Sequence, residues 1–209
     1  MNEVNRKQNE LLMQKTLRAL EKRRMTGYYA ENREEALALA ISLIPEGSTI
    51  TSGGSMTLRE IGLTEALKEG DWCFLDRSDF ADPREAFLAA YDSDVYLASV
   101  NALTQEGILV NIDGNSNRVS AMAYGPRKVI LIAGVNKLCA DLDAAMKRAR
   151  GVAAPRNAIR LKRQTPCVKT GSCMDCQSPD TICCQFLITR FSRHEDRIHV
   201  ILVNEELGF

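Results

Sequence analysis

The fold is decided by the stretch from Ser99 to Lys137, SVNALTQEGILVNIDGNSNRVSAMAYGPRKVILIAGVNK, in which two short apolar runs predict buried strands. The runs Ile108–Ile112 and Val129–Ile132 are rich in Val and Ile and are bounded by Gly, Asn and Pro, which is typical of strands. Ligands in open α/β sheets bind beyond the carboxyl ends of the strands. The polar turn between the runs is therefore a candidate ligand site, with Asp113, Gly114, Asn115, Asn117 and Arg118.

Outward from this stretch, helical and strand patterns alternate along the chain. We expect helices at 2–25, 32–45, 56–61, 65–70, 84–91 and 141–150, and further strands at 48–51, 72–75 and 95–100. Asn32 and Glu35 have the spacing of a capping box at the start of the second helix. The alternation predicts an α/β fold, with a mostly parallel sheet and helices on both of its faces.

The end of the chain has a different pattern. Gln185–Phe191 and Ile198–Val203 are alternating or apolar runs separated by six polar residues, which predicts a closing β-hairpin. We therefore divide the chain into an N-terminal helical arm at 1–30, an α/β domain at 31–164 and a cysteine-rich segment with its hairpin at 165–209.

Composition limits the class of protein. The chain has 209 residues, of which 45% are hydrophobic and 26% are charged, as in soluble globular proteins. No apolar run approaches the roughly 20 residues that span a bilayer, and the charged beginning lacks a signal peptide's apolar core. We expect a cytoplasmic protein without a membrane partner, and a homo-oligomer remains open.

Two stretches are basic. Residues 2–25 carry seven basic and three acidic side chains, and residues 147–163 carry seven basic and no acidic ones. Such runs can bind nucleic acid or a phosphate-bearing cofactor, or they can be solvated surface. The run at 147–163 contains no aromatic residue that would stack on bases. We favour solvated surface, or a dimer-packing arm for residues 2–25, over nucleic-acid binding.

The segment Ser52–Ser55, with sequence SGGS, lies between an expected strand and an expected helix. A strand, a Gly-Ser turn and a helix in this order direct backbone N–H groups at an anion. Paired glycines also occur where a chain only turns tightly. Anion binding and a tight turn are both consistent with this segment.

Five of the seven cysteines fall within 18 residues, and two of them form a CxxC pair. Thiolates at such spacing bind zinc or an iron–sulfur cluster, and a CxxC pair can also be a redox dithiol. The irregular spacing favours a cluster over the paired knuckles of zinc sites, while free thiols remain the alternative. The candidate metal ligands are Cys167, Cys173, Cys176, Cys183 and Cys184.

Several motifs together resemble the LUD-domain family of lactate-utilisation-type proteins, in the branch with a cysteine-rich tail. They are ITSGGSMTLREIG, ALTQEGILVNIDGNSNRV, GPRKVILIAGVNK, TPCVKTGSCMDC and the closing ELGF. The resemblance implies a Rossmann-like fold related to ribose-phosphate isomerases, sugar-phosphate deaminases and CoA-transferases. It also implies a part in the oxidation of lactate to pyruvate, together with iron–sulfur partner proteins.

The resemblance also implies a ligand crevice with two walls. Ser52–Ser55 forms one wall as an anion or cofactor loop, and the central acidic turn forms the other. The full set of candidate ligand residues is Ser52, Gly53, Gly54, Ser55, Asn101, Glu106, Asn111, Asp113, Gly114, Asn115, Asn117, Arg118, Asn136 and Lys137.

Glu106 and Asp113 are the candidate catalytic residues. Related sequences often carry an acid at the position of Gln105, whose amide cannot act as a carboxylate nucleophile. Because adjacent strand residues face opposite sides, Glu106 replaces that acid only if its own side chain faces the crevice. This departure argues against CoA transfer.

Three functions follow as hypotheses. The first is an accessory or electron-transfer component of organic-acid oxidation that binds an anionic metabolite or phosphate-bearing cofactor. The second is an independent enzyme acting on a sugar phosphate or a CoA ester. The third is a non-catalytic regulatory module that binds nucleic acid.

Overall fold

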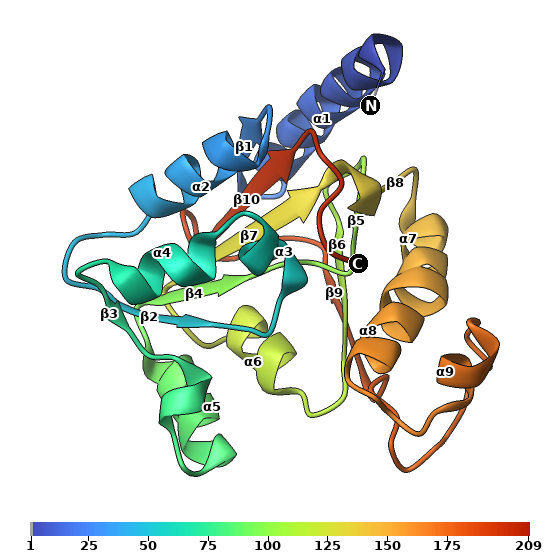
Figure 1. The fold of residues 1–209 in the computed structure, drawn as a ribbon. Coiled ribbons are helices and arrows are strands. Elements are labelled where there is room, and N and C mark those ends of the chain that lie inside the picture. Colours follow the sequence, from blue (N-terminus) through green and yellow to red (C-terminus); the bar gives the residue numbers. More distant parts are fainter. Residues whose placement is uncertain (1) are drawn as a thin grey trace.

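Six parallel strands form the central sheet of the computed structural model, which describes residues 2–209 (Figure 1). Their order across the sheet is β1 (Thr26–Ala30), β10 (Ile198–Val203), β7 (Lys128–Gly134), β4 (Val95–Ala98), β2 (Thr49–Ser52) and β3 (Cys73–Phe74). All five neighbouring pairs run parallel. The mostly parallel α/β architecture expected from the alternating pattern is confirmed.

Helices cover both faces of this sheet because its central strands are apolar on both sides. Ile130, Ile132, Ile201 and Val203 belong to one buried cluster, whereas the intervening residues of the same strands belong to a second cluster on the other face. On the first face lie α2 (Arg33–Ser42), α3 (Met56–Glu60) and α4 (Leu63–Glu69). On the second lie α1 (Glu3–Lys22), α5 (Pro83–Asp92) and α6 (Asn117–Ala123).

A second, four-stranded sheet also packs against this second face. Its order is β8 (Leu138–Cys139), β5 (Ala102–Thr104), β6 (Leu109–Asp113) and β9 (Gln185–Thr189). The two strands of the central stretch therefore belong to different sheets, β7 to the parallel one and β6 to the mixed one. The outer face of the second sheet packs on α7 (Leu142–Arg148) and on the π-helical turn Ala149–Ala153, which continues into α8 (Ala154–Arg160). After α8 comes α9 (Pro166–Thr170), which stands beside it in Figure 1.

The predicted closing hairpin is wrong. β9 pairs antiparallel with β6, whereas β10 enters the central sheet between β1 and β7. All six residues of β10 are buried, as a strand in the middle of a parallel sheet requires. β9 keeps Phe186 and Ile188 partly exposed at the edge of the second sheet.

Most element starts follow local signals. The Asn32 side chain accepts a hydrogen bond from the backbone N–H of Glu35 (2.9 Å), and the Glu35 carboxylate accepts one from Glu31 rather than from Asn32. β1 and β5 were not expected from the sequence. None of the helices within residues 2–209 combines the length and apolar character needed to cross a bilayer.

Gly134, at the end of β7, is required by close backbone contact. A Cβ there would lie 2.6 Å from the Glu205 carbonyl oxygen and 2.6 Å from the Leu207 nitrogen. We expect Gly134→Ala to lower the free energy of unfolding by about 1–3 kcal/mol, because the segment that follows β10 has to shift. The matched control is Gly151→Ala, whose Cβ meets nothing within 4 Å and whose effect should be neutral or slightly stabilising. Urea unfolding of both variants measures the difference, and equal stability would contradict this role of Gly134.

Candidate functional site

A cavity of about 360 Å³ opens beyond the carboxyl ends of β2 and β4. It is bounded by the turn after β6, by the helical turn Val135–Lys137 after β7, by α8 and by the segment 179–182. This is the edge at which ligands bind in open α/β sheets. Nine of the predicted ligand residues line it: Gly54, Ser55, Asn101, Asp113, Gly114, Asn115, Asn117, Arg118 and Lys137.

Glu106 lies elsewhere. It is exposed in the turn between β5 and β6, at the opposite end of that strand pair from Asn101 and Asp113. Its carbonyl oxygen accepts a hydrogen bond from Arg23, and the neighbouring Gly107 lies against the backbone of α1. The structure therefore gives Glu106 no position from which to act on a ligand in the cavity.

Four other predicted residues stand behind the cavity wall. Ser52 ends β2, and Gly53 lies where a Cβ would come within 2.8 Å of the Tyr96 hydroxyl. Asn111 is fully buried on β6 and accepts a hydrogen bond from Arg118. The Asn136 side chain binds the backbone of Leu207 and Gly208. These residues shape the site without lining it.

Asp113 acts as the cap of α6. Its carboxylate accepts hydrogen bonds from the backbone N–H groups of Asn115, Ser116, Arg118 and Val119, at 3.0–3.2 Å. One carboxylate oxygen is therefore occupied by the turn that precedes α6 and the other by the first turn of the helix, where a negative charge is favoured. This arrangement leaves Asp113 with a structural task and makes it a poor general base.

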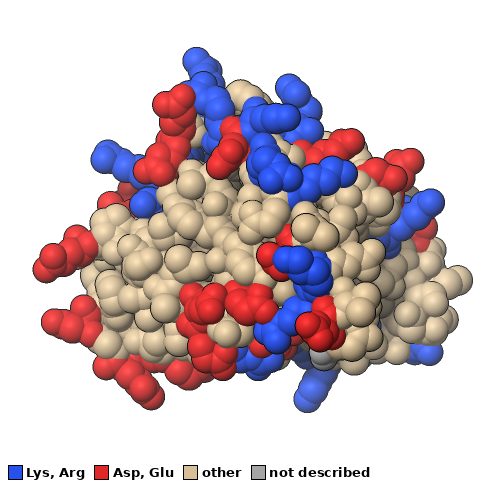
Figure 2. Space-filling model, turned by 90° about the horizontal axis from the view of Figure 1, so that it is seen from above, with Lys and Arg blue, Asp and Glu red and all other residues tan. Residues whose placement is uncertain are grey.

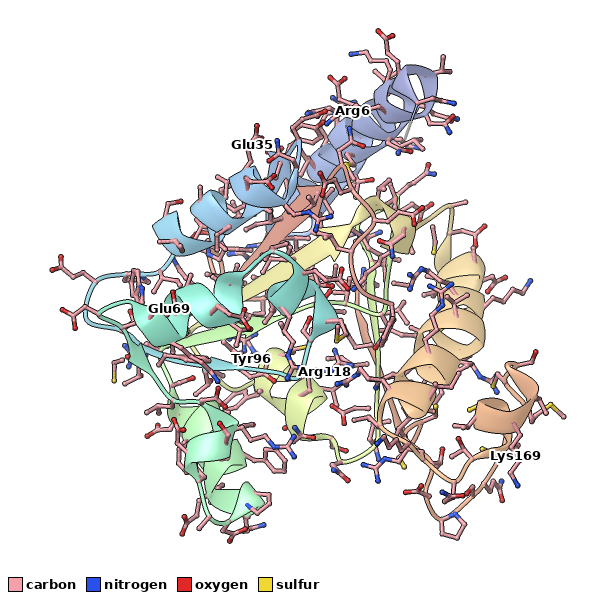
Figure 3. The ribbon with its side chains drawn as sticks, viewed as in Figure 1. Arg6, Glu35, Glu69, Tyr96, Arg118 and Lys169 are labelled. Carbon is pink, nitrogen blue, oxygen red and sulfur yellow. The ribbon has the colours of Figure 1, made fainter. Side chains whose placement is uncertain are left out.

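Arg118 joins the two sheets at the cavity. Its guanidinium donates to the Asn101 and Asn111 side-chain oxygens (2.9 and 2.7 Å) and to the backbone oxygens of Ser99 and Ile112 (3.2 and 2.7 Å). Its nearest carboxylate oxygen, on Asp113, is 3.9 Å from Nε. Figure 3 shows Arg118 near the centre of the molecule, close to Tyr96. The cavity wall thus holds a cation whose partners are almost all neutral.

Lys137 is a second buried cation, with only 3% of its surface exposed. Its Nζ donates to the hydroxyl oxygens of Thr57 and Ser99, both at 2.8 Å. Burial, followed by the positive charges of Arg148 and Arg118, lowers the pKa of Lys137 to about 7. An ammonium has three donors, so one N–H remains for a ligand.

Three arginines that were not among the predicted ligand residues also line the cavity. Arg77, from the 3₁₀ turn Arg77–Asp79, lines the cavity together with Arg160 and Arg163. Arg163 pairs with Asp180 at 3.1 Å, and its Nε is buried without a hydrogen-bond partner among the described residues. Arg160 and Arg163 belong to the basic run at 147–163, which was interpreted as solvated surface, whereas Arg77 lies outside that run. The cavity lining thus carries five basic side chains and only two acidic ones, Asp113 and Asp180.

One face of the outer surface is less polarised than the cavity lining. The face drawn in Figure 2 carries both signs of charge, with wide uncharged areas between them. No continuous basic surface suited to a nucleic-acid backbone is visible on that face.

The cysteine-rich segment encloses a smaller cavity of about 80 Å³. Cys167, Cys173, Cys176 and Cys183 line it, whereas the exposed Cys184 does not. Burial, followed by the effect of the other three thiols, Cys173 first among them, raises the pKa of Cys183 to about 11. Within residues 2–209, no group of three or more His, Cys, Asp or Glu side chains has the geometry to hold a single metal ion. Four of the five predicted metal ligands are thus brought together, but not around the position of one ion.

Comparisons with known proteins agree with this architecture. No curated protein matches the chain. A solved structure described as a DUF162 family protein from Deinococcus radiodurans is similar with a TM-score of 0.54 and 10% sequence identity, over 93% of this chain and 98% of that one. This likeness concerns the fold alone. Residues 13–203 match the family described as LUD domain, and the chain therefore belongs to the LUD domain family.

Proposed function

We propose that this protein binds a small organic anion, or the phosphate groups of a cofactor, in the basic cavity. Through that ligand it serves as an accessory component of an organic-acid oxidation system, of which lactate to pyruvate is the reaction that the family resemblance implies. The observation that carries the proposal is Lys137, a buried ammonium held only by two hydroxyls at the inner wall of the cavity.

Burying an unpaired cation costs several kcal/mol, so folded proteins rarely do so without a use for the charge. Four arginines line the same cavity, and one of the two carboxylates there already pairs with Arg163 while the other caps α6. An anion that enters therefore meets cations and N–H donors, and both side-chain carboxylates of the lining already have partners. Charge-assisted hydrogen bonds of this kind favour carboxylates and phosphates.

Independent catalysis on a sugar phosphate or a CoA ester has less support. That hypothesis requires a carboxylate in the cavity for acid–base chemistry, and Glu106 is absent from it while Asp113 is occupied by α6. The buried amine of Lys137 instead donates to two hydroxyls and can donate to an anion. Ligand binding is therefore the simpler function for this arrangement.

Arg160 provides a test that leaves the core intact. It lines the cavity from α8, whereas the exposed Arg156 on the same helix does not. We expect Arg160→Gln to weaken the binding of lactate, pyruvate or sulfate by roughly tenfold, the equivalent of one charge-assisted hydrogen bond. Isothermal titration calorimetry at low salt measures the change.

Arg156→Gln is the matched control, because it removes the same charge from the same helix. Its affinity for each anion should equal that of the unaltered protein. Equal losses in both variants would indicate a general charge effect, and no loss in either would contradict the assignment of this cavity as the anion site.

A further inference from the structure

The four cysteines that line the smaller cavity come from three separate parts of the segment 165–184. Cys167 lies on α9, Cys173 and Cys176 lie on the loop that follows, and Cys183 comes just before β9. Such convergence of thiols on one hollow, from a segment with little regular structure, requires the loop to be held in place at several points.

Local contacts hold it. Gly171 ends α9 with φ +72°, and the Asp180 carboxylate accepts the backbone N–H of Gln164 and the guanidinium of Arg163. Arg150 from the π-helical turn forms an ion pair with Asp175 and donates to the Cys173 sulfur at 3.8 Å. These contacts hold the loop against the π-helical turn and the residues that follow α8.

The size of the hollow indicates what it can accommodate. Roughly 10–15 Å³ open to the centre of a water-sized sphere is enough for one water molecule, so about 80 Å³ has room for roughly five to eight small atoms. A zinc ion needs one position with four sulfurs about 2.3 Å away, and no such grouping exists among the described residues. A four-iron cluster instead binds each cysteine through its own iron, with the sulfurs spread around an eight-atom core.

We propose that Cys167, Cys173, Cys176 and Cys183 bind a [4Fe–4S] cluster and that Cys184 is not a ligand. This inference goes beyond anion binding and does not depend on it. Cys184 instead uses its backbone N–H to bind the Asp113 carbonyl oxygen at 3.0 Å, which fixes the loop to the turn after β6.

The cluster would lie directly behind the basic cavity. Thr181 and Ile182 line both hollows, so a single strip of chain separates them. Gly114 permits this contact, because a Cβ there would lie 3.1 Å from the Ile182 Cα. A ligand in the basic cavity and a cluster in the cysteine cavity would therefore share one wall.

The test is anaerobic purification of the full chain, followed by iron and acid-labile sulfide analysis and an absorption spectrum. About four irons and four sulfides per chain are expected. Cys176→Ser and Cys167→Ser should each lose most of the iron, whereas Cys184→Ser and Cys73→Ser should retain it. Circular dichroism of the serine variants checks that their secondary structure is intact.

Three results would overturn the proposal. One is iron and sulfide at background even after anaerobic reconstitution with ferrous iron and sulfide. Another is one zinc per chain without iron. The third is a loss of iron in Cys184→Ser as large as that in Cys176→Ser. Anion titrations with cluster-free protein test the anion-binding proposal separately. Either proposal can therefore fail while the other holds.

Discussion

Replacing Arg118 with Met should lower the free energy of unfolding by about 3–5 kcal/mol and abolish anion binding. The guanidinium satisfies the carbonyl oxygens of Ser99 and Ile112 and the side-chain oxygens of Asn101 and Asn111. A thioether of similar length fills the space but leaves buried acceptors without a donor. Denaturant unfolding measures the loss of stability, and calorimetric titration with sulfate measures the loss of binding.

The control for this effect is Arg156→Met, which removes an exposed arginine from α8. Its free energy of unfolding should stay within about 0.5 kcal/mol of the unaltered protein. Arg118→Lys should recover only part of the stability, because an ammonium cannot reproduce the four hydrogen bonds that the planar guanidinium donates. A change below about 1 kcal/mol in Arg118→Met would show that the two sheets are held together without this residue.

The second large effect concerns Lys137→Met and depends on pH. Burial lowers the pKa of Lys137 from 10.5 to about 7, so the folded protein bears the full cost of the buried charge below about pH 7. Above that pH the folded state releases the proton while the unfolded state keeps it, and stability rises until about pH 10.5. One pKa unit is worth about 1.4 kcal/mol. The full difference between 10.5 and about 7 therefore changes the free energy of unfolding by up to about 5 kcal/mol.

Lys137→Met removes the pH dependence of stability that the Lys137 amine causes. Its stability relative to the unaltered protein should therefore decline by about 2–3 kcal/mol between about pH 7 and pH 9. Lys147→Met, at an exposed position on α7, is the matched control and should follow the unaltered protein at every pH. Denaturant unfolding across this range gives the comparison, and parallel curves for Lys137→Met and the unaltered protein would refute a depressed pKa.

Much of the fold follows from local patterns. Short Val- and Ile-rich runs alternate with capped amphipathic segments, and these patterns predicted β2, β4, β6, β7 and most helices. Strand partners depend on contacts between distant residues, which no local pattern encodes. The uninterrupted apolar run Ile198–Val203 did carry a signal, because all of it is buried, as in the centre of a parallel sheet. The more polar and exposed β9 fits an edge position.

The candidate site was predictable in part for the same reason. A polar turn after a buried strand marks the sheet edge, so Asn115, Asn117 and Arg118 were found. Glu106 was close to them in sequence, but the reversal of the chain between β5 and β6 carries it to the other end of the strand pair. Arg160 lines the cavity from the end of α8, and Arg163 lines it from the turn that follows this helix.

The most direct test of the anion site is calorimetric titration of the unaltered protein and of Lys137→Met with lactate, pyruvate and sulfate at pH 6 and pH 8.5. None of these anions titrates in that range, so a pH effect reports on the protein. We predict that the unaltered protein binds at least one of them roughly tenfold or more tightly at pH 6, and that the variant binds weakly without this pH dependence. Equal affinity of both proteins at both pH values, or no binding of any of the three anions, would contradict the proposal that Lys137 and its cavity bind an anion.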